Sequence, residues 1–158
     1  MSQFPAISAT DLDGRHYDVP GGLPAGPRVV IVASKRWQQV LVEMWKARLR
    51  RLEHEFPNLG VWSVAALPKL LVPVRPLIDG GMRAELDDPR IRRRTLTAYV
   101  DTETFASALG VADLETVHAF LLGPDGEIMW SGSGKPAAED VTSLGEMLAW
   151  WNPGPERG

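Results

Sequence analysis

The sequence predicts a single α/β domain: a mixed central sheet flanked by helices, preceded by an N-terminal β-hairpin. The chain has 158 residues, of which 44% are hydrophobic and 23% are charged, as in an ordinary globular domain with one core. Short apolar runs alternate with helical patterns through the first half, which favours parallel strands joined by right-handed crossovers. A later pair of short strands around a Pro-Asp-Gly turn adds antiparallel pairing, so we expect a mixed sheet.

The first half begins with a hairpin and continues with two buried strands separated by a long helix. Asp13-Gly14 lies between two short alternating runs and favours a tight turn, because glycine accepts positive φ. The continuous run RVVIVA, residues 28–33, is typical of a strand that is covered on both faces. Apolar residues at three- and four-residue spacing predict an amphipathic helix over 37–56. The run GVWSVAAL, residues 60–67, predicts the second buried strand.

The second half predicts further strand and helix segments before a short C-terminal tail. Three prolines at positions 68, 73 and 76 interrupt any continuous helix there. We therefore expect a turn, a helix over 76–85 and then a basic loop. The remaining expected elements are a strand over 95–101, a short helix ending at Gly110, two hairpin strands over 116–123 and 127–132, a helix over 137–151, and a loose tail over 152–158 of a single 1–158 domain.

Composition and charge exclude several functions. The net charge of −3 gives no reason to expect nucleic-acid binding. The absence of cysteine excludes disulfides, thiolate zinc sites and thiol redox chemistry. The three histidines lie far apart and lack metal-ligand spacing, so we expect neither a metal nor a cofactor. No apolar segment approaches the roughly 20 residues that span a bilayer, and no signal peptide is visible, so we expect a cytoplasmic protein.

The motif GSGK at residues 132–135 invites interpretation as a phosphate-binding loop. That loop needs a glycine five residues before its second glycine and a serine or threonine after the lysine. Met129 and Pro136 occupy those positions, so the motif fails. We expect a strand-to-helix turn instead.

Basic and aromatic residues suggest contact with a partner. Six arginines fall within residues 75–94, which form either a solvated loop or a basic face for an anionic partner or lipid headgroups. Adjacent tryptophans near the C-terminus point about 100° apart on a helix, so they indicate either a contact surface or a wide buried face. Backbone amides at the start of the long helix could hold a carboxylate or phosphate. The partner-binding candidates are Lys35, Arg36, Trp37, Arg75, Arg83, Arg92, Arg93, Arg94, Trp130, Trp150 and Trp151.

Several motifs together resemble the thioredoxin-like fold in its peroxiredoxin-related form. They are LDG near the start, VVIVAS leading into a helix that contains EMW, and ALGV followed by HAFLLGPDGEIMWSGSG. In active relatives a cysteine opens this helix, where the helix dipole and free amides stabilise a thiolate. The resemblance places that cysteine near Trp37 or Gln38 and its partner near Val40 or Leu41. It places the cis-proline of active relatives near Val117. The sequence has neither feature, which implies a fold without thiol redox or peroxidase activity.

Four longer pieces support a narrower resemblance. SKRWQQVLVEMWKARLRRLEHEF, RPLIDGGMRAELDD, RTLTAYVDTETFASALGV and HAFLLGPDGEIMWSGSG resemble the mitochondrial F-type ATP synthase assembly-factor family. The resemblance spans residues 8–146 and is most specific at 75–83 and 128–134. It implies a chaperone for the membrane sector, with a membrane-embedded subunit, notably the proton-channel a-type subunit, as the client. The chain lacks the family's mitochondrial targeting extension, so we expect a bacterial-type version at the inner face of the membrane.

Three functions remain open at this point. The favoured hypothesis is a non-catalytic domain that docks or chaperones a protein partner, with peripheral contact at the membrane surface. The second is an enzyme of non-thiol chemistry that uses Lys35, Arg36 or His118 around one pocket. The third is a structural or homodimeric module built on the tryptophans of the terminal helix.

Overall fold

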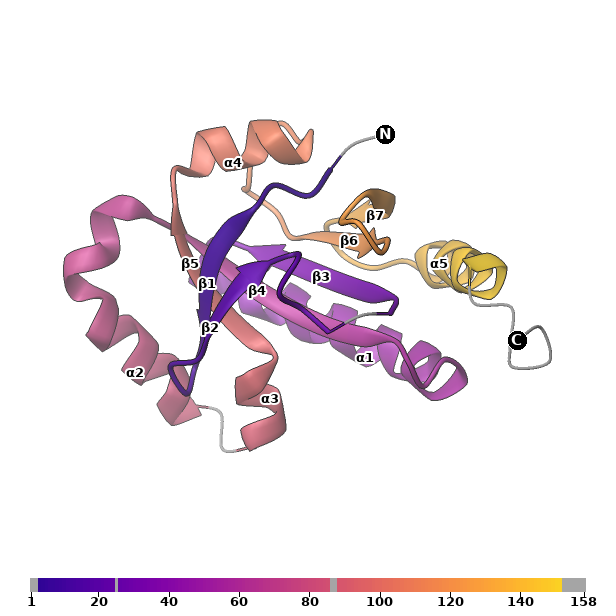
Figure 1. Cartoon of the computed structure of the whole chain (residues 1–158), viewed down its shortest axis with the longest axis horizontal. Coiled ribbons are helices and arrows are strands. Elements are labelled where there is room, and N and C mark those ends of the chain that lie inside the picture. The colour runs from indigo at the N-terminus through magenta and orange to yellow at the C-terminus, as the bar shows by residue number, and fades with distance from the viewer. Residues whose placement is uncertain (1–2, 25, 86–87, 152–158) are drawn as a thin grey trace.

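The computed structural model describes residues 3–24, 26–85 and 88–151. Strands in this part of the chain form one mixed sheet in the order β2-β1-β5-β4-β3-β6-β7 (Figure 1). The central strands β5, β4 and β3 run parallel, and antiparallel strands extend the sheet on both sides. The strands are β1 (Ile7–Asp11), β2 (His16–Val19), β3 (Arg28–Ala33), β4 (Gly60–Pro68), β5 (Thr95–Val100), β6 (His118–Leu122) and β7 (Ile128–Ser133).

Helices cover both faces of the sheet and extend past one end of it. The long helix α1 and the terminal helix α5 pack on one face, and α4 packs on the other. The segment that follows β4 lies at the left of Figure 1, away from α5. The helices are η1 (Arg36–Gln38) and η2 (Lys69–Val74), both 3₁₀, and α1 (Gln39–Glu55), α2 (Arg75–Glu85), α3 (Pro89–Arg93), α4 (Thr102–Leu109) and α5 (Ala138–Trp151).

Strand β3 divides the core into two layers. Val29 and Ile31 pack in the cluster that contains α1 and α5, whereas Val30 and Val32 pack in the cluster that contains α4. All four side chains are fully buried. Because successive side chains of a strand point to opposite faces, burial on both faces requires an unbroken apolar run. This confirms the prediction made from RVVIVA.

A pair of tryptophans holds the C-terminal hairpin against α1. The Trp45 and Trp130 rings meet edge to face, with centroids 6.1 Å apart. Gly132 lies beneath them, because a Cβ there would come within 2.9 Å of the Trp45 ring. Trp45 Nε1 donates to the Gly134 carbonyl at 2.8 Å, and Trp130 Nε1 donates to Ser143 Oγ at 3.0 Å. The GSGK stretch is therefore the strand-to-helix turn that we expected.

The basic segment differs from the expected loop. Residues 89–93 form the short helix α3. The Asp88 carboxylate accepts a hydrogen bond from the Arg90 N–H at 2.9 Å, and Pro89 starts the first turn. An acidic cap followed by proline is a standard helix start, so the Asp-Pro pair was an available signal. The expected turn after β4 is likewise a helix, η2.

The cap of α4 predicts a pH-dependent stability. The Asp101 carboxylate accepts from the Thr104 N–H at 3.1 Å, and this bond lowers the pKa of Asp101 below its ordinary value of 3.8. A carboxyl with a lowered pKa in the folded state stabilises the fold above its ordinary pKa and loses that effect as pH falls through the folded value. Asp101→Ala should therefore lower the urea midpoint at neutral pH and leave it nearly unchanged in strong acid.

The exposed Asp125 provides the control for this measurement, because Asp125→Ala removes a carboxylate from a turn and not from a helix cap. Its urea midpoint should match that of the parent at both pH values. An equal loss for Asp101→Ala at neutral and acid pH would contradict the assignment.

Candidate functional site

The side chain of Gln38 closes the start of the long helix. Gln38 is fully buried, with 0% of its surface exposed. Its Oε1 accepts hydrogen bonds from the N–H groups of Ser34 at 2.7 Å and Lys35 at 3.2 Å. Its Nε2 donates to the carbonyl of Leu114 at 2.9 Å. Both polar atoms of the carboxamide therefore have partners, as a buried amide requires.

Several backbone donors around this helix start already have acceptors. The Gln38 side chain takes the amides of Ser34 and Lys35. The Gln38 N–H donates to the Lys35 carbonyl at 3.0 Å, and the Gln39 N–H donates to the Arg36 carbonyl. An anion that binds the amides of Ser34 or Lys35 would have to displace those bonds, and a carboxylate or phosphate site at this helix start stays a prediction.

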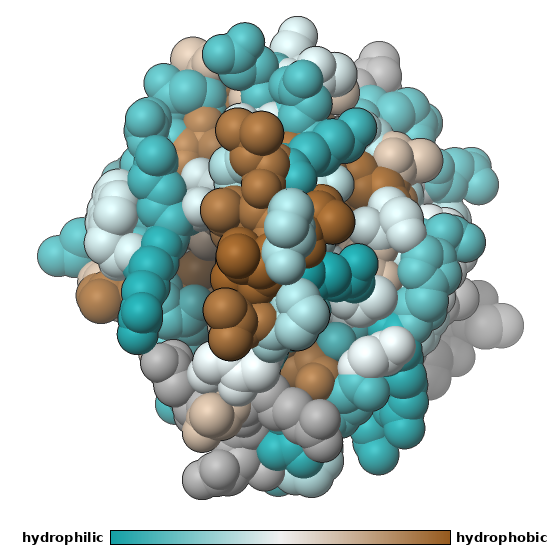
Figure 2. All heavy atoms as spheres, turned by 90° about the vertical axis from the view of Figure 1, so that its left-hand side faces the viewer, coloured by the Kyte–Doolittle hydropathy of each residue, from teal (hydrophilic) through white to brown (hydrophobic). Residues whose placement is uncertain are grey.

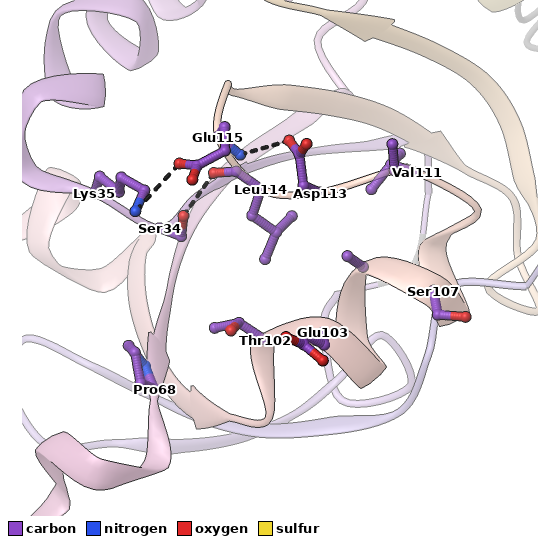
Figure 3. Close-up of a pocket in the computed structure, with 12 residues that line it drawn as sticks. Ser34, Lys35, Pro68, Thr102, Glu103, Ser107, Val111, Asp113, Leu114 and Glu115 are labelled. Carbon is purple, nitrogen blue, oxygen red and sulfur yellow. Dashed lines mark hydrogen bonds and ion pairs between the residues drawn. The ribbon is translucent and has the colours of Figure 1, made fainter.

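A pocket of about 630 Å³ opens beside the closed turn (Figure 3). Figure 3 shows it between the turn after β3, the 111–115 loop and the start of α4. Lys35 Nζ and Glu115 Oε2 form an ion pair of 3.2 Å at one side. Ser34 Oγ donates to the Leu114 carbonyl at 2.7 Å, so its hydroxyl is committed to the backbone. On the β3 side, the polar groups that line the pocket therefore already have partners.

The pocket does not bring together the three residues of the enzyme hypothesis. Lys35 lines it, but Arg36 and His118 do not. The His118 ring has Nε2 3.1 Å from the Asp113 carbonyl and stacks on Phe120 with centroids 6.2 Å apart. Among the residues that line the pocket, none forms a nucleophile–base pair.

The described residues hold neither a metal-binding group nor a membrane-spanning helix. No three histidine, aspartate or glutamate side chains lie close enough there to hold a metal ion. No helix in this part of the chain combines the length and apolarity needed to cross a bilayer.

Arg75, a candidate for partner binding, is tied into the fold. Its Nη2 donates to Thr10 Oγ1 at 2.8 Å, and its Nε pairs with Asp79 Oδ2 at 3.3 Å. Its guanidinium also lies 5.2 Å from the centre of the Tyr99 ring. Arg75 thus connects α2 to β1 and β5, which is a structural role.

Two other arginine candidates also contact distant segments. Arg92 Nε pairs with Asp13 Oδ1 at 3.1 Å. Arg94 Nη1 lies 3.8 Å from Glu53 Oε2, and its guanidinium lies 6.0 Å from the centre of the Trp62 ring. These carboxylates offset much of the positive charge of the arginines in residues 75–94, which the sequence suggested as a possible basic face.

The remaining candidates are scattered. Arg93 is exposed on α3, and Trp37 is 59% exposed at the start of the long helix. Trp150 is 76% exposed near the end of α5. The side chains of Arg83 and Trp151 lie outside the described residues. Partner contact through these residues therefore stays a prediction.

An apolar ridge that the sequence analysis missed follows β4. We define the η2–α2 ridge as Leu70, Val72, Val74 and Leu77, of which Leu70 is 90% and Leu77 is 78% exposed. Figure 2, which faces this end of the molecule, shows apolar side chains gathered in a band. Contiguous exposed apolar surface commonly marks a site of interaction. The available signal was KLLVPVRPLI, an apolar run whose prolines prevent a regular buried helix.

Solved structures of three other proteins share this architecture. BsSco, a member of the Sco family of cytochrome c oxidase assembly proteins, matches with a TM-score of 0.62 at 14% identity over 94% of both chains. The exposed lipoprotein thioredoxin Etrx1 of Streptococcus pneumoniae matches with a TM-score of 0.58 at 9% identity, over 91% of this chain and 100% of its own. AhpC of Mycobacterium tuberculosis matches with a TM-score of 0.55 at 18% identity over 96% of both chains. The chain has a thioredoxin-like fold.

This thioredoxin-like chain has no thiol with which to perform disulfide exchange. At the position where the resemblance places a cis-proline, Val117 is fully buried in the core, and the peptide bond that precedes it is not cis. No protein-family model and no curated protein sequence matches the chain. The likeness to solved structures therefore establishes the fold.

Replacing the buried carboxamide should destabilise the protein. Gln38→Leu keeps a similar volume but leaves the Ser34 and Lys35 amides without their acceptor. Each buried unsatisfied group costs about 1–3 kcal/mol, so the free energy of unfolding should fall by about 2–4 kcal/mol in urea denaturation. Gln39→Leu is the matched control, because the Gln39 side chain is exposed and its Nε2 donates to the exposed Glu43 side chain. Equal stability of the two variants would show that Gln38 does not hold this turn.

Proposed function

We propose that this protein is a redox-inactive thioredoxin-fold binding protein that acts as an assembly factor or chaperone for a membrane-protein partner. The exposed η2–α2 ridge is the observation that carries this proposal. A surface leucine gains about 1.5–3 kcal/mol when a partner removes it from water, and Leu70 and Leu77 are almost wholly available for that gain. An apolar partner segment is the natural complement of such a surface.

The closed helix start supports binding rather than turnover. In thiol enzymes of this fold the same place must offer a reactive sulfur and free donors to stabilise it. Here a buried carboxamide fills the place and takes the nearby amides. These hydrogen bonds connect the turn to the 111–115 loop and present no reactive group, which supports binding rather than turnover.

Two likenesses support an assembly role. The motifs at residues 75–83 and 128–134 resemble the F-type ATP synthase assembly-factor family, which makes a membrane-embedded subunit of that enzyme the favoured client. BsSco, which has the same fold, belongs to a family of cytochrome c oxidase assembly proteins. The fold is therefore compatible with helping a membrane complex to assemble.

A homodimeric module is the second candidate. The exposure of Trp150 favours it, because a large aromatic side chain at the end of α5 can anchor a protein–protein contact. The two candidates use opposite ends of the molecule, so single substitutions separate them.

Pull-down from detergent-solubilised native membranes tests the proposed function. The parent chain should enrich an integral membrane protein, and mass spectrometry should show whether it belongs to the ATP synthase membrane sector. Leu77→Asp should reduce that enrichment at least about tenfold, because docking would bury an unpaired charge. Trp150→Asp is the matched control and should leave the enrichment unchanged.

Enrichment of no membrane protein by the parent chain would defeat the proposal. So would retention of the same proteins by Leu77→Asp. Loss of enrichment with Trp150→Asp alone, together with a concentration-dependent mass for the parent chain, would favour the homodimeric module.

A further inference from the structure

The η2–α2 ridge is continuous with the pocket beside the closed helix start. A second hollow of about 510 Å³ includes Leu70 of the ridge. It shares Pro68, Thr102 and Glu103 with the pocket of Figure 3. A partner peptide that lies on the ridge can therefore continue past Leu70 into the pocket, because the two hollows share lining residues.

Carboxylates outnumber amines among the side chains that line the two hollows. The amine of Lys35 is matched by its ion pair with Glu115. Neither Glu103 nor Asp113 pairs with a basic side chain in the part of the chain that the structure describes. The charged side chains that line the two hollows are Lys35, Lys69, Asp101, Glu103, Asp113 and Glu115.

The exposed Asp101 carboxylate at the start of α4 has a nearby partner of opposite charge. Its hydrogen bond with the Thr104 N–H lowers its pKa below the ordinary value of 3.8, and Lys69 lies near enough to favour the same ionised form. With Lys69 set against Asp101 and Lys35 against Glu115, the charges of Glu103 and Asp113 remain to attract a cation. The surface thus changes from apolar at the ridge to negative at the pocket.

We propose that the ridge and the pocket form one docking surface for an apolar protein segment that is followed directly by lysine or arginine. The apolar part would cover Leu70 and Leu77, and the basic part would reach Glu103 and Asp113. Basic residues commonly flank the apolar spans of membrane proteins, so the end of such a span has this order of chemistry. The inference rests on the proposed function and specifies which part of the client is bound.

Charge decides against a lipid surface as the occupant. Peripheral proteins use lysine and arginine beside their apolar residues, because membrane surfaces are negative. Here Glu103 and Asp113 would be repelled. The same carboxylates favour a basic peptide, since complementary potentials guide association and fix the orientation of the partner.

Binding of two synthetic peptides to the full chain tests this inference. Both carry the same labelled leucine–alanine helix, which ends in Lys-Arg-Lys in one peptide and in Glu-Asp-Glu in the other. Fluorescence anisotropy should show at least about tenfold tighter binding of the basic peptide at low salt. Because salt screens exposed charges, the difference between the peptides should shrink at high ionic strength.

Two variants and one control assign the effect to this surface. Leu77→Ser should weaken binding of both peptides, whereas Glu103→Lys should weaken the basic peptide about tenfold and strengthen the acidic one. Glu146→Lys makes the same charge change on an exposed position of α5 and should alter neither affinity. Urea denaturation of each variant confirms that the fold persists.

Equal affinities for the two peptides would overturn the inference, as would an equal effect of Glu103→Lys and Glu146→Lys. Leu77-dependent binding to vesicles of anionic lipid without peptide binding would assign the surface to lipid. Self-association abolished by Leu77→Ser would assign it to a second copy of the chain. If the peptides fail to bind but the membrane pull-down still depends on Leu77, the inference falls while the proposed function stands.

Discussion

The hydrogen bonds of one buried carboxamide organise the end of this molecule where the parallel strands finish. Gln38 joins the turn after β3 to the 111–115 loop, because its oxygen accepts from that turn and its nitrogen donates to Leu114. The Ser34 hydroxyl donates to the same carbonyl and strengthens the connection. A buried amide without partners would destabilise the fold, so this cluster tolerates little change. In thioredoxin-like proteins that carry a thiol, the start of this helix is reactive, whereas here Gln38 links two loops through hydrogen bonds.

The Gln38 hydrogen bonds and the two-layer core together position the η2–α2 ridge and the pocket. Strands β3 and β4 run side by side, in register from Arg28 with Gly60 to Ala33 with Ala65, and β4 continues to Pro68. The chain beyond β3 folds back into α1, whereas the chain beyond β4 turns outward into η2, where Pro73 prevents a regular helix. Ligands of open α/β sheets bind at the carboxyl ends of the strands, and the ridge and pocket lie at that end. The proposed docking surface therefore lies where ligands of this kind of sheet usually bind.

Local patterns predicted the strands and the longer helices, because each of these elements carries its own signal, whereas the short helices η2 and α3 were expected as a turn and a loop. The apolar run of β3 and the helical spacing of α1 depend on residues close in sequence, and the resemblance placed the missing cysteine near Trp37 or Gln38. Long-range charge pairing was not accessible in the same way. Arg75 contacts Thr10 and Arg94 contacts Glu53 only because the sheet brings distant strands together. The arginine-rich stretch therefore suggested a basic face that its carboxylate partners largely offset.

The η2–α2 ridge was hidden for a different physical reason. Leucine and valine in sequence usually indicate a core, and whether something covers them depends on the whole fold. Val72 and Val74 lie soon after a buried strand, so apart from the prolines of KLLVPVRPLI nothing in the residue types distinguishes them from core positions. The same holds for Glu103 and Asp113, whose approach to one pocket depends on how α4 and the 111–115 loop pack.

Hydrogen exchange of the Gln38 side-chain amide, followed by NMR, tests most directly whether this residue closes the site. The buried Nε2 protons, and the Ser34 and Lys35 backbone amides bonded to Oε1, should exchange far more slowly than the side-chain amide of exposed Gln39. Exchange of the Gln38 amide as fast as that of Gln39 would mean that the helix start is open to water, and the account would be wrong at its foundation.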